Sequence, residues 1–439
     1  MIERVLYNAA LPLAAAAARV AGLFDRKIAA GFAGRAGLRE RWRERAAVLD
    51  RRRRTVWFHV SSAGEFLQAR PVIDLLAARH ADKVQVALTF FSPSGMNFFR
   101  RHDRSSSNAA IVFADYLPLD TPRNARFCLE TLRPDLVVYV KFDLWPNLII
   151  EAARTGIPQI LISGTLSPGS WRLRRPAHRF YGSLYSKLDS IAAITDEDAA
   201  RFAGQIAGTT RVFSAGDTRF DQVCARYDNP STSIPSAFSD DARRILIAGS
   251  TWPRDEAVLI PGFARLLRGR PETMLVLAPH EPSPKRLREI DHSLRRAGLE
   301  RVLLSGLGAG PARAPVVVAD GVGYLADLYR TGSAAYVGGS WTSGVHNVME
   351  PAVAGLPVLF GPKIDNSWEA GRLVAIGAGR IVRTPEEFAA AAGELLADED
   401  LRSRLGDAAS RFIRSGCGAA RRCAEMIEQR LGPERTPGD

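Results

Sequence analysis

The feature that most constrains this fold is the regular alternation of short apolar runs with stretches of helical periodicity. The runs are apolar on nearly every residue, as in Leu-Val-Val-Tyr-Val at 136–140. Strands buried on both faces have this composition and occur in parallel sheets covered by helices. Strands are predicted over 56–60, 84–89, 110–113, 136–140, 160–162 and 190–194, and in a second series over 244–248, 274–278, 301–304, 316–319, 335–337 and 358–360. The sequence therefore predicts two doubly wound, Rossmann-like αβα domains that face a cleft, with ligands at the carboxyl ends of the strands.

A polar, turn-rich stretch at 228–236 separates the two series and is typical of a linker between domains. The expected organisation is a basic segment over 1–54, an αβα domain over 55–227, a linker over 228–240, a second αβα domain over 241–415, a terminal helix over 416–432 and a disordered tail over 433–439.

The first 54 residues carry most of the excess positive charge. They contain thirteen Arg or Lys against five Asp or Glu, which is two-thirds of the net charge of +12. The Ala-rich run over 5–18 is interrupted by Pro12 and is too short to span about 30 Å of hydrocarbon, and no cleaved signal peptide is indicated. We expect an interfacial helix with a polybasic follower that binds an anionic membrane surface. A solvated basic face, or an RNA-binding arm, would have a similar composition.

The glycine-rich segment over 338–351 indicates a nucleotide site. It follows an apolar run and reads as strand, loop and short helix, with His346 and Asn347 at the expected helix start. Backbone N–H groups of such a loop, and the helix dipole, suit a phosphate, while Glu350 could accept hydrogen bonds from ribose hydroxyls. The chain has no P-loop ending in Lys-Ser/Thr, which argues against an NTPase. An ordinary glycine turn of a βαβ unit is the alternative.

Six motifs together carry a family resemblance. They are His-Val-Ser-Ser-Ala-Gly-Glu at 59–65, Tyr-Leu-Pro-Leu-Asp at 116–120, Leu-Trp-Pro-Asn-Leu at 144–148, Gly-Asp-Thr-Arg-Phe-Asp at 216–221, Ala-Gly-Ser-Thr at 248–251, and His-Asn with Glu-Pro within 346–351. In this order the chain resembles the 3-deoxy-D-manno-octulosonic acid (Kdo) transferases of lipopolysaccharide synthesis. It departs from their pattern at 141–143, at 279–286, at Val345, where the family usually has glycine, and at Arg219.

The resemblance implies a GT-B glycosyltransferase that moves Kdo from CMP-Kdo to the lipid A precursor (lipid IVA). The transfer inverts the anomeric centre and takes place at the cytoplasmic face of the inner membrane of a Gram-negative bacterium. The competing hypotheses are another GT-B enzyme that uses a UDP-sugar, and a non-catalytic membrane- or nucleic-acid-binding protein that keeps the fold.

With the resemblance, Glu65 becomes the expected general base, because inverting transfer needs a carboxylate that takes the proton of the acceptor hydroxyl. Its alternative role is that of a glutamate in the first turn of a helix, favoured by the dipole. Acceptor contacts are expected from Ser62, Gly64, Asp143, Arg172, Arg174 and Arg175, and donor contacts from Arg219, Ser250, Thr251, His280, Gly344, His346, Asn347 and Glu350.

Several of these residues have a simpler reading. Asp143 could form a surface ion pair with Lys141, Ser250 and Thr251 could cap a helix, and Glu350 could be a capping carboxylate. The basic loop over 171–179 suits lipid phosphate, but it could equally be a solvated surface loop or bind RNA; of the functional readings we favour lipid phosphate and expect no nucleic-acid partner.

No metal or cofactor is expected. The Asp-x-Asp matches at 196–198 and 398–400 read as helix starts rather than as a metal site for a nucleotide sugar. The four cysteines form neither a Cys-x-x-Cys pair nor a ligand cluster, which favours a reducing compartment without structural zinc.

Overall fold

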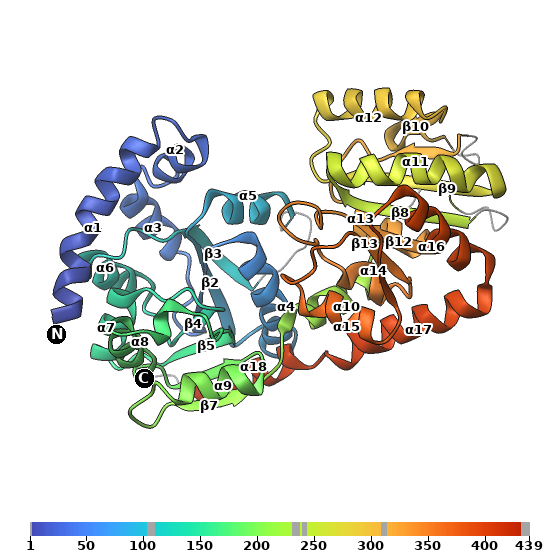
Figure 1. The fold of residues 1–439 in the computed structure, drawn as a ribbon. Coiled ribbons are helices and arrows are strands. Elements are labelled where there is room, and N and C mark those ends of the chain that lie inside the picture. The colour runs from blue at the N-terminus through green and yellow to red at the C-terminus, as the bar shows by residue number, and fades with distance from the viewer. Residues whose placement is uncertain (1, 103–109, 231–237, 239–243, 309–313, 432–439) are drawn as a thin grey trace. The chain divides into compact units, whose positions relative to one another are not determined.

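The computed structural model describes residues 2–102, 110–230, 238, 244–308 and 314–431 (Figure 1). It divides into two compact units. Unit 1 comprises Met1–Gln222 together with Gly416–Asp439, and unit 2 comprises Val223–Ser415. Most of the expected linker 228–240, and all of the expected tail 433–439, lie outside the described residues.

Unit 1 is built on one parallel sheet with the strand order β3-β2-β1-β4-β5-β6-β7 in its described residues. The strands are β1 (Arg54–Val60), β2 (Val84–Phe90), β3 (Ile111–Tyr116), β4 (Leu136–Val140), β5 (Gln159–Gly164), β6 (Ser190–Ala193) and β7 (Arg211–Ser214). The helices that follow the N-terminal segment are α4 (Ala63–His80), α5 (Pro93–His102), α6 (Pro122–Leu132), α7 (Pro146–Arg154), α8 (Ala177–Tyr185), α9 (Asp196–Ala203) and α10 (Thr218–Asp228).

The C-terminal helix α18 (Ala419–Leu431) belongs to unit 1, where it packs against α4 and β4. Its small and apolar side chains, among them Ala420, Cys423 and Ile427, are buried in that core. The carboxylate of Asp221 receives N–H bonds from Gly418 and Ala420 and so fixes the start of the helix.

Unit 2 repeats the architecture with the order β10-β11-β9-β8-β12-β13-β14 in its described residues. Its strands are β8 (Arg244–Thr251), β9 (Thr273–Pro279), β10 (Arg301–Leu303), β11 (Val316–Val318), β12 (Ala334–Val337), β13 (Val358–Phe360) and β14 (Gly379–Ile381). Its helices are α11 (Pro253–Gly269), α12 (Pro284–Arg296), α13 (Leu325–Leu328), α14 (Met349–Val353), α15 (Trp368–Ala375), α16 (Pro385–Ala397) and α17 (Glu399–Ser415).

Each sheet has a point at which the strand order reverses. In unit 1 the first strand, β1, pairs with β2 on one side and β4 on the other. In unit 2 the first strand, β8, pairs likewise with β9 and β12. In open α/β sheets ligands bind outside the carboxyl ends of the strands at such switch points. The loops after β1, β4, β8 and β12 are therefore the places where sites are expected.

The predicted α/β class and the two parallel sheets are confirmed, and every predicted strand is present within a few residues. Two edge strands, β7 and β14, were not predicted. Their sequences, Arg-Val-Phe-Ser and Gly-Arg-Ile, are short and half-exposed, because an edge strand is covered on fewer sides. They therefore lack the continuous apolar run that marks the central strands.

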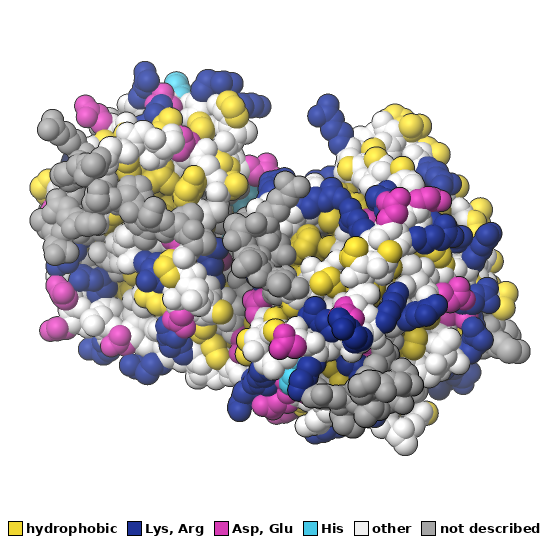
Figure 2. All heavy atoms as spheres, turned by 180° about the vertical axis from the view of Figure 1, so that it is seen from behind, with side chains coloured by type: hydrophobic (Ala, Val, Ile, Leu, Met, Phe, Trp, Pro, Cys, Tyr) yellow, Lys and Arg dark blue, Asp and Glu magenta, His cyan; other side chains and the backbone are white. Residues whose placement is uncertain are grey.

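The N-terminal segment forms three helices, α1 (Ile2–Ala21), α2 (Arg26–Ala33) and α3 (Leu38–Ala46). α3 is part of the unit 1 core, since Trp42 is fully buried and its indole N–H donates to the carbonyl of Tyr116. Arg41 and Arg45 form ion pairs with the buried Asp115. Part of the positive charge of this segment is thus neutralised inside unit 1. On the face seen in Figure 2, Lys and Arg side chains lie on the surface of both units.

The outer face of α1 is apolar and unpaired. The side chains of Val5, Leu6, Leu13 and Val20 are 60–74% exposed, and Phe24, just beyond the helix, is 88% exposed. The opposite face packs on the rest of unit 1, where Arg4, Tyr7 and Asn8 form hydrogen bonds with Glu151, Asp120 and Asn147 respectively. Within the described residues, no helix is both long enough and apolar enough to cross a bilayer.

Candidate functional site

Glu65 lies in the first turn of α4, directly after the switch-point strand β1. Its Oε2 accepts hydrogen bonds from the backbone N–H groups of Ser61 and Ser62, while the Ser62 hydroxyl accepts the N–H of Glu65 at 3.4 Å. This is a capping box, so the capping role that the sequence allows for Glu65 is real. The cap uses one carboxylate oxygen, and no hydrogen bond to Oε1 is found in the described part of the chain.

The environment of Glu65 gives it a pKa suited to a proton acceptor. Burial raises the pKa to about 7, and the nearby negative charge of Asp143 adds to the effect. The N–H bonds from Ser61 and Ser62, and the charge of Lys141, oppose the shift. A general base works best when its pKa lies near the working pH, and Glu65 meets that condition.

Asp143 follows β4, the strand next to β1 in the sheet. Burial raises its pKa to about 6, and Arg172 opposes the shift. No ion pair between Lys141 and Asp143 occurs among the described residues, so the surface-pair alternative is not what the structure shows. Lys141 itself has a φ of 68°, a left-handed conformation that costs a non-glycine residue energy and is concentrated at functional sites.

Buried polar atoms without partners gather at this edge of unit 1. They are Nε2 of His59, Oγ of Ser61, Oδ2 of Asp143, Nε1 of Trp145 and Nε of Arg172. Since more than nine in ten buried polar groups in native proteins are hydrogen-bonded, this concentration indicates that a ligand or water completes the site. His59, Ser61 and Trp145 were not predicted as site residues, although they lie within the motifs that carry the family resemblance.

Gly64 is exposed in the α4 turn, and a Cβ atom built there would meet nothing closer than Ser62 Oγ at 4.0 Å. The fold itself therefore does not require glycine at this position. The open space leaves room for a ligand to approach the backbone at Gly64.

The structure divides the basic loop over 171–179 into two parts. The guanidinium of Arg172 lies over the rings of Phe142 and Tyr181, close enough to Asp143 to affect its pKa. Arg174 and Arg175 instead line a separate open cavity of about 550 Å³. Its other lining residues are mostly apolar and come from α1, the loop and α8: Glu3, Leu6, Trp171, Pro176, Ala177 and Phe180.

In unit 2 three rings stack at the carboxyl ends of the switch-point strands. Trp252 and His280 lie 4.9 Å apart between centroids, and His280 and His346 lie 4.5 Å apart at 11°. The indole N–H of Trp252 donates to Nε2 of His346 at 2.8 Å. Burial, and then His280, lower the pKa of His346, so His346 is neutral with its proton on Nδ1 at neutral pH. Trp252 was not predicted.

Ser250 and Thr251, at the end of β8, do not cap α11. Thr251 is buried and its hydroxyl donates to Glu256 at 2.9 Å, while the cap is supplied by Asp255, which accepts the N–H of Trp252. Ser250 has a φ of 53°, in the same left-handed region as Lys141. Arg286 forms ion pairs with Glu256 and Glu289. His280, by contrast, is stacked with Trp252 and His346 at this edge of the sheet.

The glycine-rich loop is more irregular than expected. Helix α14 begins at Met349 rather than at Gly344–Asn347, and the side chains of Val345 and Val348 before it are buried. Gly344 has a φ of 114°, and a Cβ there would lie 2.2 Å from the side chain of Asn366. The positive φ and the contact with Asn366 together mean that the fold itself requires glycine at this position. The N–H of Gly344 donates to the carbonyl of Gly339.

Glu350 lies in the first turn of α14, and no backbone N–H cap to it is found in the described chain. Burial raises its pKa, while Arg226 and the Asn347 side chain oppose the shift and Asp327 adds to it. Asn347 also accepts the N–H of Met349 at 3.0 Å. Glu350 and Asn347, both predicted donor residues, thus form a side-chain hydrogen bond within unit 2.

Arg219 is the exception among the predicted donor residues, because it belongs to unit 1 and forms an ion pair with Asp217 at 2.7 Å. The other predicted donor residues are in unit 2. Across the described residues, no group of three or more His, Cys, Asp or Glu side chains is placed to hold a metal ion.

Comparison with known proteins points to one family. A family model described as 3-deoxy-D-manno-octulosonic-acid transferase (kdotransferase) matches residues 40–222. The chain is 29% identical to a 3-deoxy-D-manno-octulosonic acid transferase of Bordetella pertussis, over 86% of this chain and 87% of the relative. It is 26% identical to the protein of the same name from Haemophilus influenzae, with the same coverage.

Among solved structures, the fold is similar to that of UDP-GlcNAc 2-epimerase from Neisseria meningitidis. The TM-score is 0.58, with 14% identity over 86% of this chain and 99% of the epimerase. At this identity the likeness concerns the fold alone, which is GT-B-like with two parallel α/β sheets.

Proposed function

The chain belongs to the 3-deoxy-D-manno-octulosonic acid (Kdo) transferase family, and on that premise we propose that it transfers Kdo from CMP-Kdo to the lipid A precursor, lipid IVA. The observation that carries the proposal is the Glu65 carboxylate. It lies at the switch point of unit 1, is held by two backbone N–H groups, and has a pKa of about 7. A carboxylate of that kind can take a proton from a sugar hydroxyl at neutral pH.

The proposed reaction is a single displacement with inversion. The acceptor hydroxyl oxygen attacks the anomeric carbon of Kdo, the bond from that carbon to the phosphate oxygen breaks, and CMP leaves with the electron pair. Glu65 accepts the hydroxyl proton. Asp143 keeps the pKa of Glu65 high, and Ser62 and Gly64 shape the turn beside which the acceptor lies.

Donor binding is proposed for unit 2. Glu350 and Asn347 would hold the ribose, and the stacked His280 and His346 would face the phosphate end of CMP. The remaining predicted donor contacts are Arg219, Ser250, Thr251 and Gly344. The Thr251 hydroxyl and the Gly344 N–H already form hydrogen bonds within the fold. These two residues would therefore contact the donor through other backbone atoms or support neighbouring contacts.

Acceptor binding is proposed for the basic loop and its cavity. The acceptor carries phosphates and acyl chains, and the cavity combines Arg174 and Arg175 with apolar walls from Trp171, Phe180 and Leu6. Arg172, closer to Asp143, would bind nearer the reacting hydroxyl.

The outer face of α1 supports the proposed contact with the cytoplasmic face of the inner membrane of a Gram-negative bacterium. A helix that is polar toward its own domain and apolar toward solvent is suited to lie in the interface of a bilayer. Arg19 in the last turn of α1, and Arg26 and Lys27 at the start of α2, would attract anionic headgroups.

Mass spectrometry of lipid IVA incubated with the full chain and CMP-Kdo formed in situ tests the function. The expected result is addition of Kdo by the wild type and little addition by Glu65→Gln. Absence of addition by the wild type, with CMP-Kdo present throughout, would overturn the proposal. Calorimetry with CMP and UDP separates it from a UDP-sugar enzyme, which would bind UDP more tightly.

A further inference from the structure

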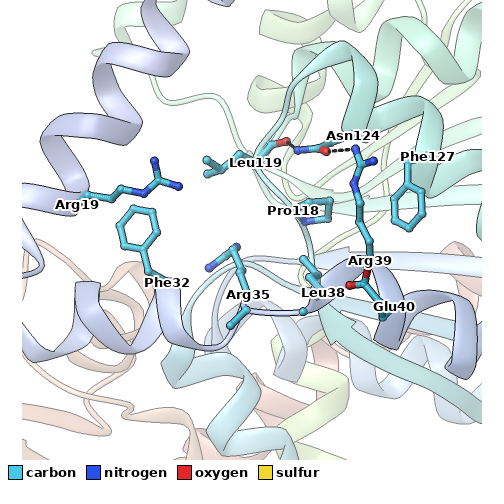
Figure 3. Close-up of a pocket in the computed structure, with 12 residues that line it drawn as sticks. Arg19, Phe32, Arg35, Leu38, Arg39, Glu40, Pro118, Leu119, Asn124 and Phe127 are labelled. Atoms are coloured by element: carbon cyan, nitrogen blue, oxygen red, sulfur yellow. Dashed lines mark hydrogen bonds between the residues drawn. The ribbon is translucent and has the colours of Figure 1, made fainter.

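A second cavity lies between the N-terminal helices and the loop before α6 (Figure 3). It has a volume of about 570 Å³ and is lined by α1, α2, α3, the loop over 117–120 and α6. In Figure 3 the guanidinium of Arg19 points across the cavity toward Leu119, and the hydrogen bond from Arg39 to Asn124 lies on the other side. None of the proposed catalytic, donor or acceptor residues contributes to its lining.

Basic side chains outnumber acidic ones in the lining of this cavity. Arg19, Arg35 and Arg39 line it with only one acid, Glu40, and none of the three arginines forms an ion pair among the described residues. Arg35 is the most enclosed, and it donates to the neutral carbonyl oxygens of Gly31, Phe91 and Leu117. Burial lowers its pKa to about 10, while Tyr116 and Asp115 oppose the shift, so Arg35 stays protonated at neutral pH.

The contrast with the opposite face of α3 shows that this imbalance is local. There Arg41 and Arg45 pair with the buried Asp115. Arg19 is exposed and Arg39 is half-buried, and neither forms an ion pair in the described part of the chain, so this part of the cavity is complementary to an anionic group.

The walls of the cavity are apolar. Phe32, Leu38, Pro118 and Leu119 line it, and the Phe127 ring lies beneath the guanidinium of Arg39 at 4.9 Å. The exposed apolar residues Val20 and Phe24 follow Arg19 closely in the sequence. A free phosphate would use the arginines but not these walls.

We infer that this cavity binds the phosphodiester headgroup of an anionic glycerophospholipid, with Arg19 and Arg39 on the phosphate and the apolar walls against the glycerol and the upper acyl chains. The inference extends the proposed membrane contact of α1 from a general surface attraction to a defined lipid site. It does not depend on transfer activity, because no donor or acceptor takes part.

Calorimetry with dihexanoyl phosphatidylglycerol, kept below its micelle concentration, tests the site on the full chain. Saturable binding at one site per chain is expected, and Arg19→Gln/Arg39→Gln should weaken it at least tenfold. The matched control is Arg123→Gln/Arg126→Gln on α6, which removes the same charge from exposed positions outside the cavity and should leave the affinity within about twofold. Glycerol 3-phosphate should bind at least tenfold more weakly than the lipid.

Equal weakening by the two double variants would show only general charge attraction and overturn the inference. So would the absence of saturable binding, or glycerol phosphate binding as tightly as the lipid. Mass spectrometry of lipid IVA remains a separate readout, so failure of the lipid site and failure of the proposed transfer can be told apart.

Discussion

At the scale of single residues, Glu65 combines two roles that the sequence presents as alternatives. One oxygen closes the capping box of α4, and burial with the charge of Asp143 raises the pKa of the same group to about 7. A capping carboxylate on an open surface would be ionised well below neutral pH. Enclosure beside a second carboxylate is what turns this cap into a candidate base.

Replacing Glu65 with Gln should lower the transfer rate by about 10²–10⁴-fold, the usual contribution of a positioned proton acceptor. The amide oxygen can still accept the N–H bonds of Ser61 and Ser62, so CMP affinity and melting temperature should barely change. Initial rates and melting temperature measured on one preparation check this. A large drop in melting temperature with normal turnover of the surviving fraction would mean that Glu65 is structural.

The rate should rise with pH through about 7 as Glu65 loses its proton, and the variant Asp143→Asn should move this rise to lower pH because it removes a charge that raises the pKa of Glu65. Folding raises the pKa of Glu65 from 4.5 to about 7, so the folded state holds this proton more tightly than the unfolded state does. As the pH rises from about 4.5 to 7, the stability of the wild type should therefore fall relative to that of Glu65→Gln. Rate and thermal unfolding profiles of the three proteins test both statements. A profile that does not move in Asp143→Asn would contradict the coupling.

Two glycines of the predicted site should respond differently to substitution by Ala. Gly344→Ala should destabilise the fold by about 2–4 kcal/mol, since φ is positive and Asn366 occupies the space of the Cβ atom. Gly64→Ala should leave stability within about 0.5 kcal/mol, since its Cβ atom would meet no protein atom closer than 4.0 Å, and it should lower transfer because the methyl group would occupy space proposed for the acceptor. Denaturant unfolding and initial rates of both variants decide this; a Gly64→Ala protein with normal kinetics would remove Gly64 from the site.

At the scale of elements, α1 shows how one helix can face two environments. Its inner face is held by Arg4, Tyr7 and Asn8, and Tyr7 donates to Asp120 at 2.9 Å. Burial raises the pKa of Asp120 to about 7, so this contact joins a protonatable carboxyl to the helix. The outer face has no protein partner in the described chain, which leaves it available to a membrane.

Changing Leu6, Leu13, Val20 and Phe24 to Ser should release the protein from anionic vesicles while the melting temperature stays nearly constant, because these side chains are 60–88% exposed. Binding of the wild type should also weaken at high salt, which shortens the range of the charge attraction. Sedimentation with vesicles is the measurement. Unchanged sedimentation of the Ser variant would contradict the proposed membrane contact. Charge reversal at Arg41 or Arg45 is unsuitable as a test, because it would break their ion pairs with Asp115 and so disturb the fold.

At the scale of the whole molecule, the proposed base and most of the proposed donor contacts belong to different compact units. Each set lies at the carboxyl ends of the strands that flank a switch point, which is where open α/β sheets bind ligands. The two parts of the reaction should therefore be separable by mutation.

Glu350→Gln should weaken CMP binding about tenfold or more, because a neutral amide makes weaker hydrogen bonds to ribose hydroxyls than a carboxylate does. Glu65→Gln should leave CMP binding unchanged, and the wild type should prefer CMP to UDP. Isothermal calorimetry on the three proteins gives all of these values. Equal loss of CMP affinity in both variants would contradict the division of roles.

The sequence by itself determined the elements and the class of fold. Apolar runs and helical periodicity are properties of neighbouring residues, so the buried central strands and the place of Glu65 at a helix start could be read directly. The family motifs contain His59, Glu65, Glu350 and their neighbours, so these positions can be marked from the amino-acid order alone. The half-exposed edge strands β7 and β14 were not predicted, because their burial depends on where the sheet ends.

Only the tertiary structure decided which charges are free and which polar groups are enclosed. Arg41 meets Asp115 across 74 residues of sequence, while Arg39 on the same helix finds no acid among the described residues. The pKa of Glu65 depends on burial and on Asp143, a residue in another loop of the sheet. Desolvation and ion pairing arise between groups that are distant in the chain, and no local pattern encodes them.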